Sequence, residues 1–188
     1  MHRRLLLLIF SLFLPSILQA HNLPIGAPLP NVGVADKGEL LYQNNEFSYK
    51  FWNSAQLKGK IYLIQHMAAS ASASEMNAAM VETAKKANLP QKYYQMTTIV
   101  NADDALFGSS VYSRNWLENN KKMSPVSQFI LDTHGDVRQA WGLQAKTSAI
   151  VVLDARGRVR YVKEGALTLK EVQRVINLLH RLIPGGAN

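Results

Sequence analysis

The sequence predicts an α/β fold: a mixed β-sheet with helices on both faces. Apolar runs of strand length alternate with amphipathic segments of helical length through much of the chain, the pattern of βαβ units. Two further apolar strands around a short glycine turn follow, and then a long amphipathic helix. Alternating units favour parallel strands and a closing hairpin adds antiparallel ones, so the predicted sheet is mixed.

The chain before the first βαβ unit is expected to be partly irregular. Residues 21–31 are rich in proline and glycine, which predicts an extended lead-in segment. A hairpin is expected next, with strands at 32–35 and 39–42 around the turn 36–38, where Gly38 tolerates a positive φ. The segment 44–54 mixes aromatic and polar residues, and we expect it to be irregular.

Residues 60–67 form the predicted central strand. The apolar run lacks polar alternation, so both faces of this strand are expected to be buried. His66 lies near its carboxyl end. After a turn of small residues, Ser72 and Glu75 fit a capping box, and apolar residues at helical spacing predict a helix over 72–87.

The later elements follow from the same signals. Apolar runs mark strands, helical periodicity marks helices, and clusters of Gly, Pro, Asn and Asp mark turns. A capping box from Thr168 to Glu171 starts the last helix, which ends before Pro184. In chain order we expect a strand at 94–100, a helix at 110–120, a strand at 127–131, a short helix at 136–141, a hairpin of 149–153 and 158–163, and a helix at 169–182.

Residues 1–20 have the layout of a secretory signal peptide. Two arginines precede an apolar core, and the small residue Ala20 precedes His21. The apolar run is too short for a retained membrane span, so we expect none after cleavage. The sequence therefore predicts an exported protein in which residues 21–188 form one domain.

Charge and cysteine content exclude several classes of function. The chain has a formal net charge of +8, which becomes +6 without the two arginines of the leader. The excess is spread over short basic pieces rather than one aromatic-rich face, so we expect no nucleic-acid partner. There is no cysteine, so thiol chemistry is excluded and stability must come from the hydrophobic core.

Several segments together carry a family resemblance. They are AHNLPIG at the start, FSYKFWNSAQLKGK, the strand end IQHMA, YQMTTIVNADDA, ENNKKMSP with SQFILD close behind it, and SAIVVLDARGRVRYVKEGALTLKEV. Over essentially all of residues 21–188 the chain resembles the YtfJ family of exported bacterial proteins, within the thioredoxin-like superfamily. The resemblance implies a thioredoxin-like fold and a periplasmic location, but no particular activity.

The resemblance also implies that a redox site is missing. In the thioredoxin pattern two cysteines occupy the strand-to-helix turn and a cis-proline faces them. Here the turn, residues 69–74, holds only alanine and serine, and Thr147 and Ser148 stand where the proline is expected. A cis peptide there is costly without proline. Thiol–disulfide exchange is therefore excluded for this chain.

Candidate site residues gather where the predicted parallel strands end, which is where ligands collect in α/β sheets. His66, beside a helix N-terminus, is either a ligand or hydrogen-bond donor with a lowered pKa, or a partly buried histidine bonded to nearby backbone. The serines of the turn are either helix caps or a hydroxyl nucleophile. The predicted ligand or partner surface comprises His66, Ser70, Ser72, Ser74, Asn101, Asp103, Thr147 and Ser148.

A metal site is a second candidate. After cleavage His21 offers an α-amino group and an imidazole, a pair that chelates copper, and His66 is a possible third ligand for copper or zinc. Asn101 and Asp103, at the end of a neighbouring strand, join such a site if it forms, although an Asp-rich turn before a helix is the ordinary explanation for them.

Three tryptophans are either core residues or the wall of an aromatic groove. Trp141, in the short helix, is expected to be buried. Trp52, in the segment expected to be irregular, is predicted to be the most exposed of the three, and Trp116 lies on a predicted helix.

Together these observations favour a non-redox binding or adaptor module of the periplasm that acts on a periplasmic protein or a small ligand. The alternative is a thiol-independent enzyme or a metal-binding protein that uses the strand-end site around His66. We expect no cofactor in the first case and copper or zinc in the metal-binding form of the second.

Overall fold

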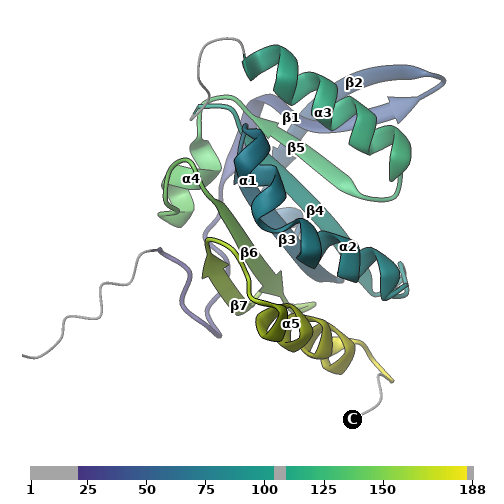
Figure 1. The fold of residues 1–188 in the computed structure, drawn as a ribbon, viewed down its shortest axis with the longest axis vertical. Coiled ribbons are helices and arrows are strands. Elements are labelled where there is room, and N and C mark those ends of the chain that lie inside the picture. Colours follow the sequence, from purple (N-terminus) through teal and green to yellow (C-terminus); the bar gives the residue numbers. More distant parts are fainter. Residues whose placement is uncertain (1–20, 104–108, 186–188) are drawn as a thin grey trace, which may run out of the picture.

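A computed structural model describes residues 21–103 and 109–185, and the predicted signal peptide, residues 1–20, lies outside them. The described chain is built on one seven-stranded sheet of order β2-β1-β5-β4-β3-β6-β7 (Figure 1). The strands are β1 (Gly33–Gln43), β2 (Glu46–Asn53), β3 (Ile61–Ala68), β4 (Tyr94–Asn101), β5 (Gln128–Asp132), β6 (Ser148–Leu153) and β7 (Val159–Glu164). The helices are α1 (Ala71–Met76), α2 (Ala78–Lys86), α3 (Ser109–Met123), α4 (Asp136–Trp141) and α5 (Leu169–Leu182), with a 3₁₀ turn at Ser54–Gln56.

The centre of the sheet is parallel and its edges are antiparallel. β3 pairs in parallel with β4, and β4 with β5, as expected of two successive βαβ units. β6 and β7 form the predicted antiparallel hairpin, and β6 pairs antiparallel with β3. Every residue of β3 is buried, which confirms the prediction of a central strand.

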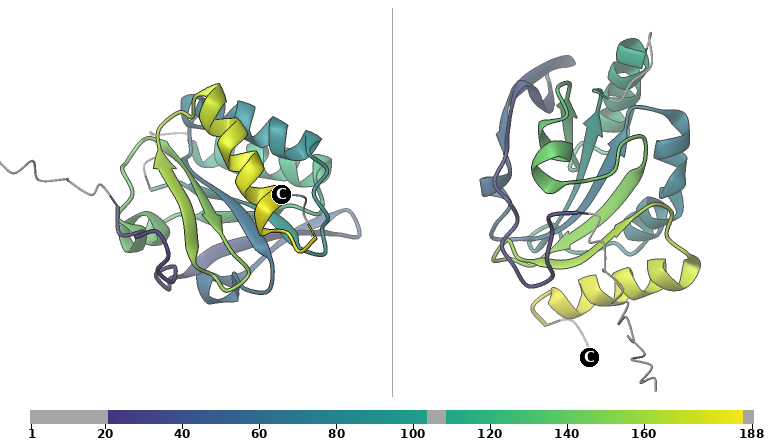
Figure 2. Two further views of the ribbon diagram at one scale, coloured as in Figure 1. Left: turned by 90° about the horizontal axis from the view of Figure 1, so that it is seen from below. Right: turned by 90° about the vertical axis from the view of Figure 1, so that its left-hand side faces the viewer.

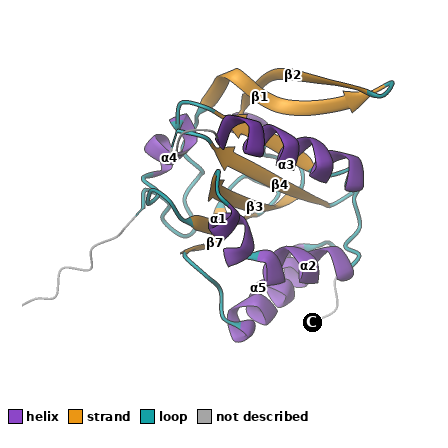
Figure 3. Cartoon of the chain, turned by 45° about the horizontal axis from the view of Figure 1, so that its top comes forward, coloured by secondary structure: helices purple, strands orange, loops and turns teal. Residues whose placement is uncertain are grey.

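Helices cover both faces of the sheet, as predicted. Right-handed crossovers from β3 to β4 and from β4 to β5 place α1, α2 and α3 on one face, and α5 packs beside α2 there (Figures 1 and 3). The connection from β5 to β6 carries α4 on the other face (Figure 2). Successive residues of β3 therefore join different cores: Ile64 packs with Val137 of α4, and Leu63 packs with Met80 of α2.

The lead-in segment belongs to the face of α4. Leu23 is fully buried in the core cluster of that face, and the Asn22 amide donates to the Trp141 carbonyl over 2.7 Å. Trp141 is fully buried, as predicted. The expectation for Trp52 is wrong: it is also fully buried, because the segment that contains it is strand β2 rather than irregular chain.

The predicted turn at Asp36–Gly38 is also wrong. β1 runs through it as one strand, with an irregularity in its pairing between Val34 and Glu39. Gly38 has φ +77°, and a Cβ there would collide with the Lys50 carbonyl oxygen. The hairpin turns instead at Asn44 and Asn45, which both adopt positive φ, as a two-residue hairpin turn requires.

The helix predicted over 72–87 is two helices, because the chain breaks at Asn77 between α1 and α2. The last helix is as predicted: Thr168 accepts from the Glu171 amide and the Glu171 carboxylate accepts from the Thr168 amide, a complete capping box. Within residues 21–103 and 109–185, no helix is long and apolar enough to cross a membrane.

Candidate functional site

A serine caps the helix that follows β3, but it is not the serine predicted from the sequence. Ser70 is the N-cap of α1, and its Oγ accepts from the Ala73 amide over 3.2 Å. Ser72 is exposed, and its hydroxyl lies 3.2 Å from that of Ser70. Ser74 donates to the Ala71 carbonyl over 2.8 Å. The capping role predicted for Ser72 therefore belongs to Ser70.

Asn77 lies at the break between α1 and α2 and bonds to the start of β6 and to the segment after β7. The sequence alone did not predict this role. Its Nδ2 donates to Ser148 Oγ and to the Gly165 carbonyl, both over 3.1 Å, and its Oδ1 accepts from the Leu167 amide over 3.1 Å. Asn77 is only 1% exposed. A polar, weakly helix-forming residue within an Ala- and Met-rich helical pattern was the available signal.

His66 is buried on the face of α4. It lies between Ile99 of β4 and Ala149 of β6 and is 2% exposed. Burial first, and then the positive charge of Arg138, lowers the pKa of His66 from 6.5 to about 3. The imidazole is therefore neutral at physiological pH, and its Nε2 has no hydrogen-bond partner among the described residues.

The predicted strand-end surface is not brought together. Ser148 pairs with Met67, the residue after His66, so strand alternation directs Ser148 to the face opposite that of His66. Ser148 is also fully buried and accepts from Asn77. Thr147 donates to the Met76 sulfur over 3.3 Å. Of the predicted residues around this turn, Ser70, Ser72, Ser74 and Thr147 retain exposed area, and His66, the base predicted to lie with them, is buried on the other face.

Asn101 and Asp103 lie on the α4 side, near a buried carboxylate that the sequence analysis did not single out. Asn101 Oδ1 accepts from the Asp103 amide over 3.0 Å, and the Asp103 carboxylate is 3.3 Å from Arg138. Asp132 is fully buried and accepts from the amides of Asp136 and Val137 at the start of α4. The Asp132 contacts join the start of α4 to β5, and the contact between Asn101 and Asp103 is an Asx turn.

Within the described part of the chain, the residues predicted to bind a metal do not form a cluster of ligands. His21 is half-buried, and its Nδ1 accepts from the Leu23 amide over 3.3 Å. Among the residues that the structure describes, no three His, Asp or Glu side chains gather closely enough to hold a metal ion. A site formed by His21 and His66 stays a prediction.

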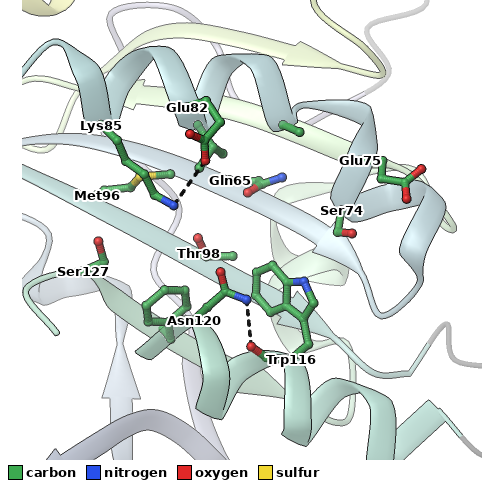
Figure 4. Close-up of a pocket in the computed structure, with 13 residues that line it drawn as sticks. Gln65, Ser74, Glu75, Glu82, Lys85, Met96, Thr98, Trp116, Asn120 and Ser127 are labelled. Atoms are coloured by element: carbon green, nitrogen blue, oxygen red, sulfur yellow. Dashed lines mark hydrogen bonds and ion pairs between the residues drawn. The ribbon is translucent and has the colours of Figure 1, made fainter. Parts of the chain in front are cut away.

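A pocket lies on the opposite face, between α1–α2 and α3 (Figure 4). We call this cavity, of about 220 Å³, the Gln65 pocket. Its floor comes from β3, β4 and β5, one wall from α1 and α2, and the other wall from α3. Its lining residues are Gln65, Ser74, Glu75, Ala78, Val81, Glu82, Lys85, Met96, Thr98, Trp116, Asn120, Ser127 and Phe129.

The walls of the Gln65 pocket differ in chemistry. The α2 wall carries an ion pair, Lys85 Nζ to Glu82 over 3.5 Å. The α3 wall presents the Trp116 indole, which packs edge-on against Phe129 at 6.3 Å between ring centroids, and the amide of Asn120, which donates to the Trp116 carbonyl over 2.8 Å. The pocket therefore combines a charged wall on α2 with an aromatic and amide-bearing wall on α3.

Gln65 is the unusual residue of this pocket. It is 3% exposed, and its Nε2 makes no hydrogen bond to any described residue. Figure 4 shows its amide in the space between α2 and Trp116. A buried amide donor without a partner costs about 1–3 kcal/mol, so such a group is rarely left in place without a reason.

Comparison with known proteins gives a consistent family. The model of a family described as "Bacterial protein of unknown function (YtfJ_HI0045)" matches residues 23–182. A protein of Escherichia coli (strain K12), "Uncharacterized protein YtfJ", is 49% identical over 180 residues, 96% of this chain and 98% of that one. An "Uncharacterized protein" of Haemophilus influenzae is 38% identical over 182 residues, 97% of this chain and 99% of the other.

Solved structures with similar folds are thioredoxin-like proteins. The thioredoxin domain of a thiol-disulfide oxidoreductase from Bacteroides vulgatus has a TM-score of 0.54 at 13% identity, covering 83% of this chain and 97% of that one. A 2-Cys peroxiredoxin of Plasmodium vivax has a TM-score of 0.55 at 14% identity, covering 84% and 82%. At these identities the likeness shows the fold alone, which is the thioredoxin-like fold predicted from the sequence.

Proposed function

The chain belongs to the YtfJ family of bacterial proteins, and we propose that it is a periplasmic binding protein that uses a thioredoxin-like scaffold without redox chemistry. The secretory layout of residues 1–20 supports export, and the lack of cysteine excludes thiol exchange. At the turn where related folds carry cysteines, Ser70 and Ser74 are engaged in local helix contacts.

The observation that carries the proposal is the unpaired Gln65 amide in its pocket. A ligand with a carbonyl, carboxylate or hydroxyl oxygen at this point would accept from Gln65 Nε2 and remove the cost of burying it. Val81, Met96 and Phe129 offer apolar contact beside it. Binding is therefore favoured at the pocket between α2 and α3, rather than at the surface around His66 that the sequence predicted.

Native mass spectrometry of the exported protein tests this function. The protein is purified from the periplasm under mild conditions and weighed before and after denaturation, together with Gln65→Met and a control, Gln173→Met, on the exposed face of α5. Methionine keeps the unbranched shape of glutamine and removes the amide donor.

We expect a non-protein mass on the wild type and on Gln173→Met that denaturation releases, and none on Gln65→Met. An identical bound mass on all three proteins, or no bound mass on any of them, contradicts the proposal.

A further inference from the structure

The Gln65 pocket continues along the sheet into a second cavity. This cavity, also of about 220 Å³, shares Lys85, Met96 and Ser127 with the first. Among its further lining residues, Lys60 lies just before β3, Asn88 lies in the loop after α2, Tyr94 begins β4, and Val126 lies in the loop before β5. We call the two cavities together the long groove. It follows the strand direction, with Gln65 near one end and Tyr94 near the other.

Tyr94 repeats the feature that marks Gln65. The residue is 9% exposed, and its hydroxyl is buried without a hydrogen-bond partner among the described residues. Burial raises the pKa of Tyr94, so the phenol stays protonated and is a donor throughout the physiological range. Gln65 and Tyr94 thus both line the groove, and each carries a buried donor without a partner among the described residues, so one ligand that reaches both donors can satisfy them.

The spacing of the two donors sets the length of such a ligand. Tyr94 pairs with Ile61 and Thr98 pairs with Gln65, so the two residues that carry these donors lie four backbone positions apart along the strands. At about 3.3 Å per residue this separation is about 13 Å, which exceeds the size of a single small ring. An extended peptide covers the same distance with about four residues.

The charges at the two ends of the long groove are opposite. Glu75, on α1, lies at the Gln65 end. Lys60 lines the Tyr94 end. Between them the charges of Glu82 and Lys85 are paired with each other. A ligand that complements the groove therefore carries a positive group near Glu75 and a negative group near Lys60.

We infer that the long groove binds a short peptide of about four residues with free termini. Its amino terminus lies toward Glu75 and its carboxylate toward Lys60, and its backbone carbonyls accept from Gln65 Nε2 and Tyr94 Oη. A neutral sugar lacks the charged ends, and a lipid chain lacks acceptors along its length. Val81, Met96 and Trp116 offer contacts for small side chains. The inference rests on the proposed function, because it uses the same pocket.

Calorimetric titration of the full exported protein with tetra-alanine tests the inference. Matched probes are dialanine and N-acetyl-tetra-alanine amide, which has the same length and no charged ends. The variants are Tyr94→Phe, which removes one hydroxyl, and Tyr161→Phe, a control on β7 outside the groove. Urea unfolding of both variants verifies that they fold, and Tyr94→Phe is expected to be at least as stable as wild type because it removes a buried, unpaired hydroxyl.

Tetra-alanine is expected to bind more tightly than dialanine and about 5- to 10-fold more tightly than the capped peptide, since each exposed ion pair adds a small increment. Tyr94→Phe should weaken tetra-alanine about 3- to 10-fold, the value of one hydrogen bond, and leave dialanine unchanged. Tyr161→Phe should change neither.

Equal binding of the three probes, no binding of tetra-alanine at millimolar concentration, or insensitivity to Tyr94→Phe overturns the peptide inference. In those cases a bound mass that is present on the wild type and absent from Gln65→Met still supports the proposed function. If the wild type and Gln65→Met carry the same bound mass, or neither carries one, the proposed function itself is refuted.

Discussion

Removal of the Asn77 side chain should destabilise the protein more than any exposed polar substitution. Asn77→Ala deletes three hydrogen bonds that link the α1–α2 break to Ser148, Gly165 and Leu167. At about 1 kcal/mol for each bond the loss is about 3 kcal/mol. The better helix propensity of alanine returns at most about 0.7 kcal/mol, so the expected net loss is about 2–3 kcal/mol.

Urea unfolding followed by circular dichroism measures this change, with Asn119→Ala on the exposed face of α3 as the control. The control should alter the free energy of unfolding by less than about 0.5 kcal/mol. If Asn77→Ala costs less than about 1 kcal/mol, its three contacts do not hold the break between α1 and α2 in place.

Two further predictions concern residues of the strand-end region. The unfolded chain protonates His66 near its ordinary pKa of 6.5 but the folded protein only near 3, so the free energy of unfolding should fall as the pH drops between these values. His66→Gln, followed by urea unfolding from pH 7 to 4, should show a shallower fall, and an unchanged slope would contradict the burial of a neutral imidazole. Ser70→Ala should lower the free energy of unfolding by about 1 kcal/mol, and Ser72→Ala by less than about 0.5 kcal/mol, because Ser70 is the N-cap of α1. The reverse order in the same assay would show that Ser72 is the cap.

The elements that the sequence predicts well are those specified by local pattern. The buried run of β3, the short helix α4 and the capping box of α5 each carry their signal within a few residues. β1 is different, because its irregular pairing near Gly38 is set by contact with β2 and β5, which are distant in sequence. A local glycine turn was therefore predicted where a continuous strand forms.

The site was harder to predict because the sequence of a strand that is buried on both faces does not show which side chains lie on which face of the sheet. The position of His66 at the end of β3 was predicted, but its face and its burial depend on the pairing of β3 with β4 and β6. The same ambiguity hid Gln65, whose polar amide within an apolar run was the available signal. The partners of Asn77 lie 71 to 90 residues away in sequence, beyond any local pattern.

The free energy of unfolding of Gln65→Met, measured without added ligand, tests whether the buried amide of Gln65 is reserved for a ligand. If the amide is kept unpaired for a ligand, its removal should stabilise the free protein by about 1 kcal/mol or more, because the cost of burying the donor disappears. A destabilisation of about 1 kcal/mol or more would show that the amide supports the fold, and would contradict a binding site at this pocket.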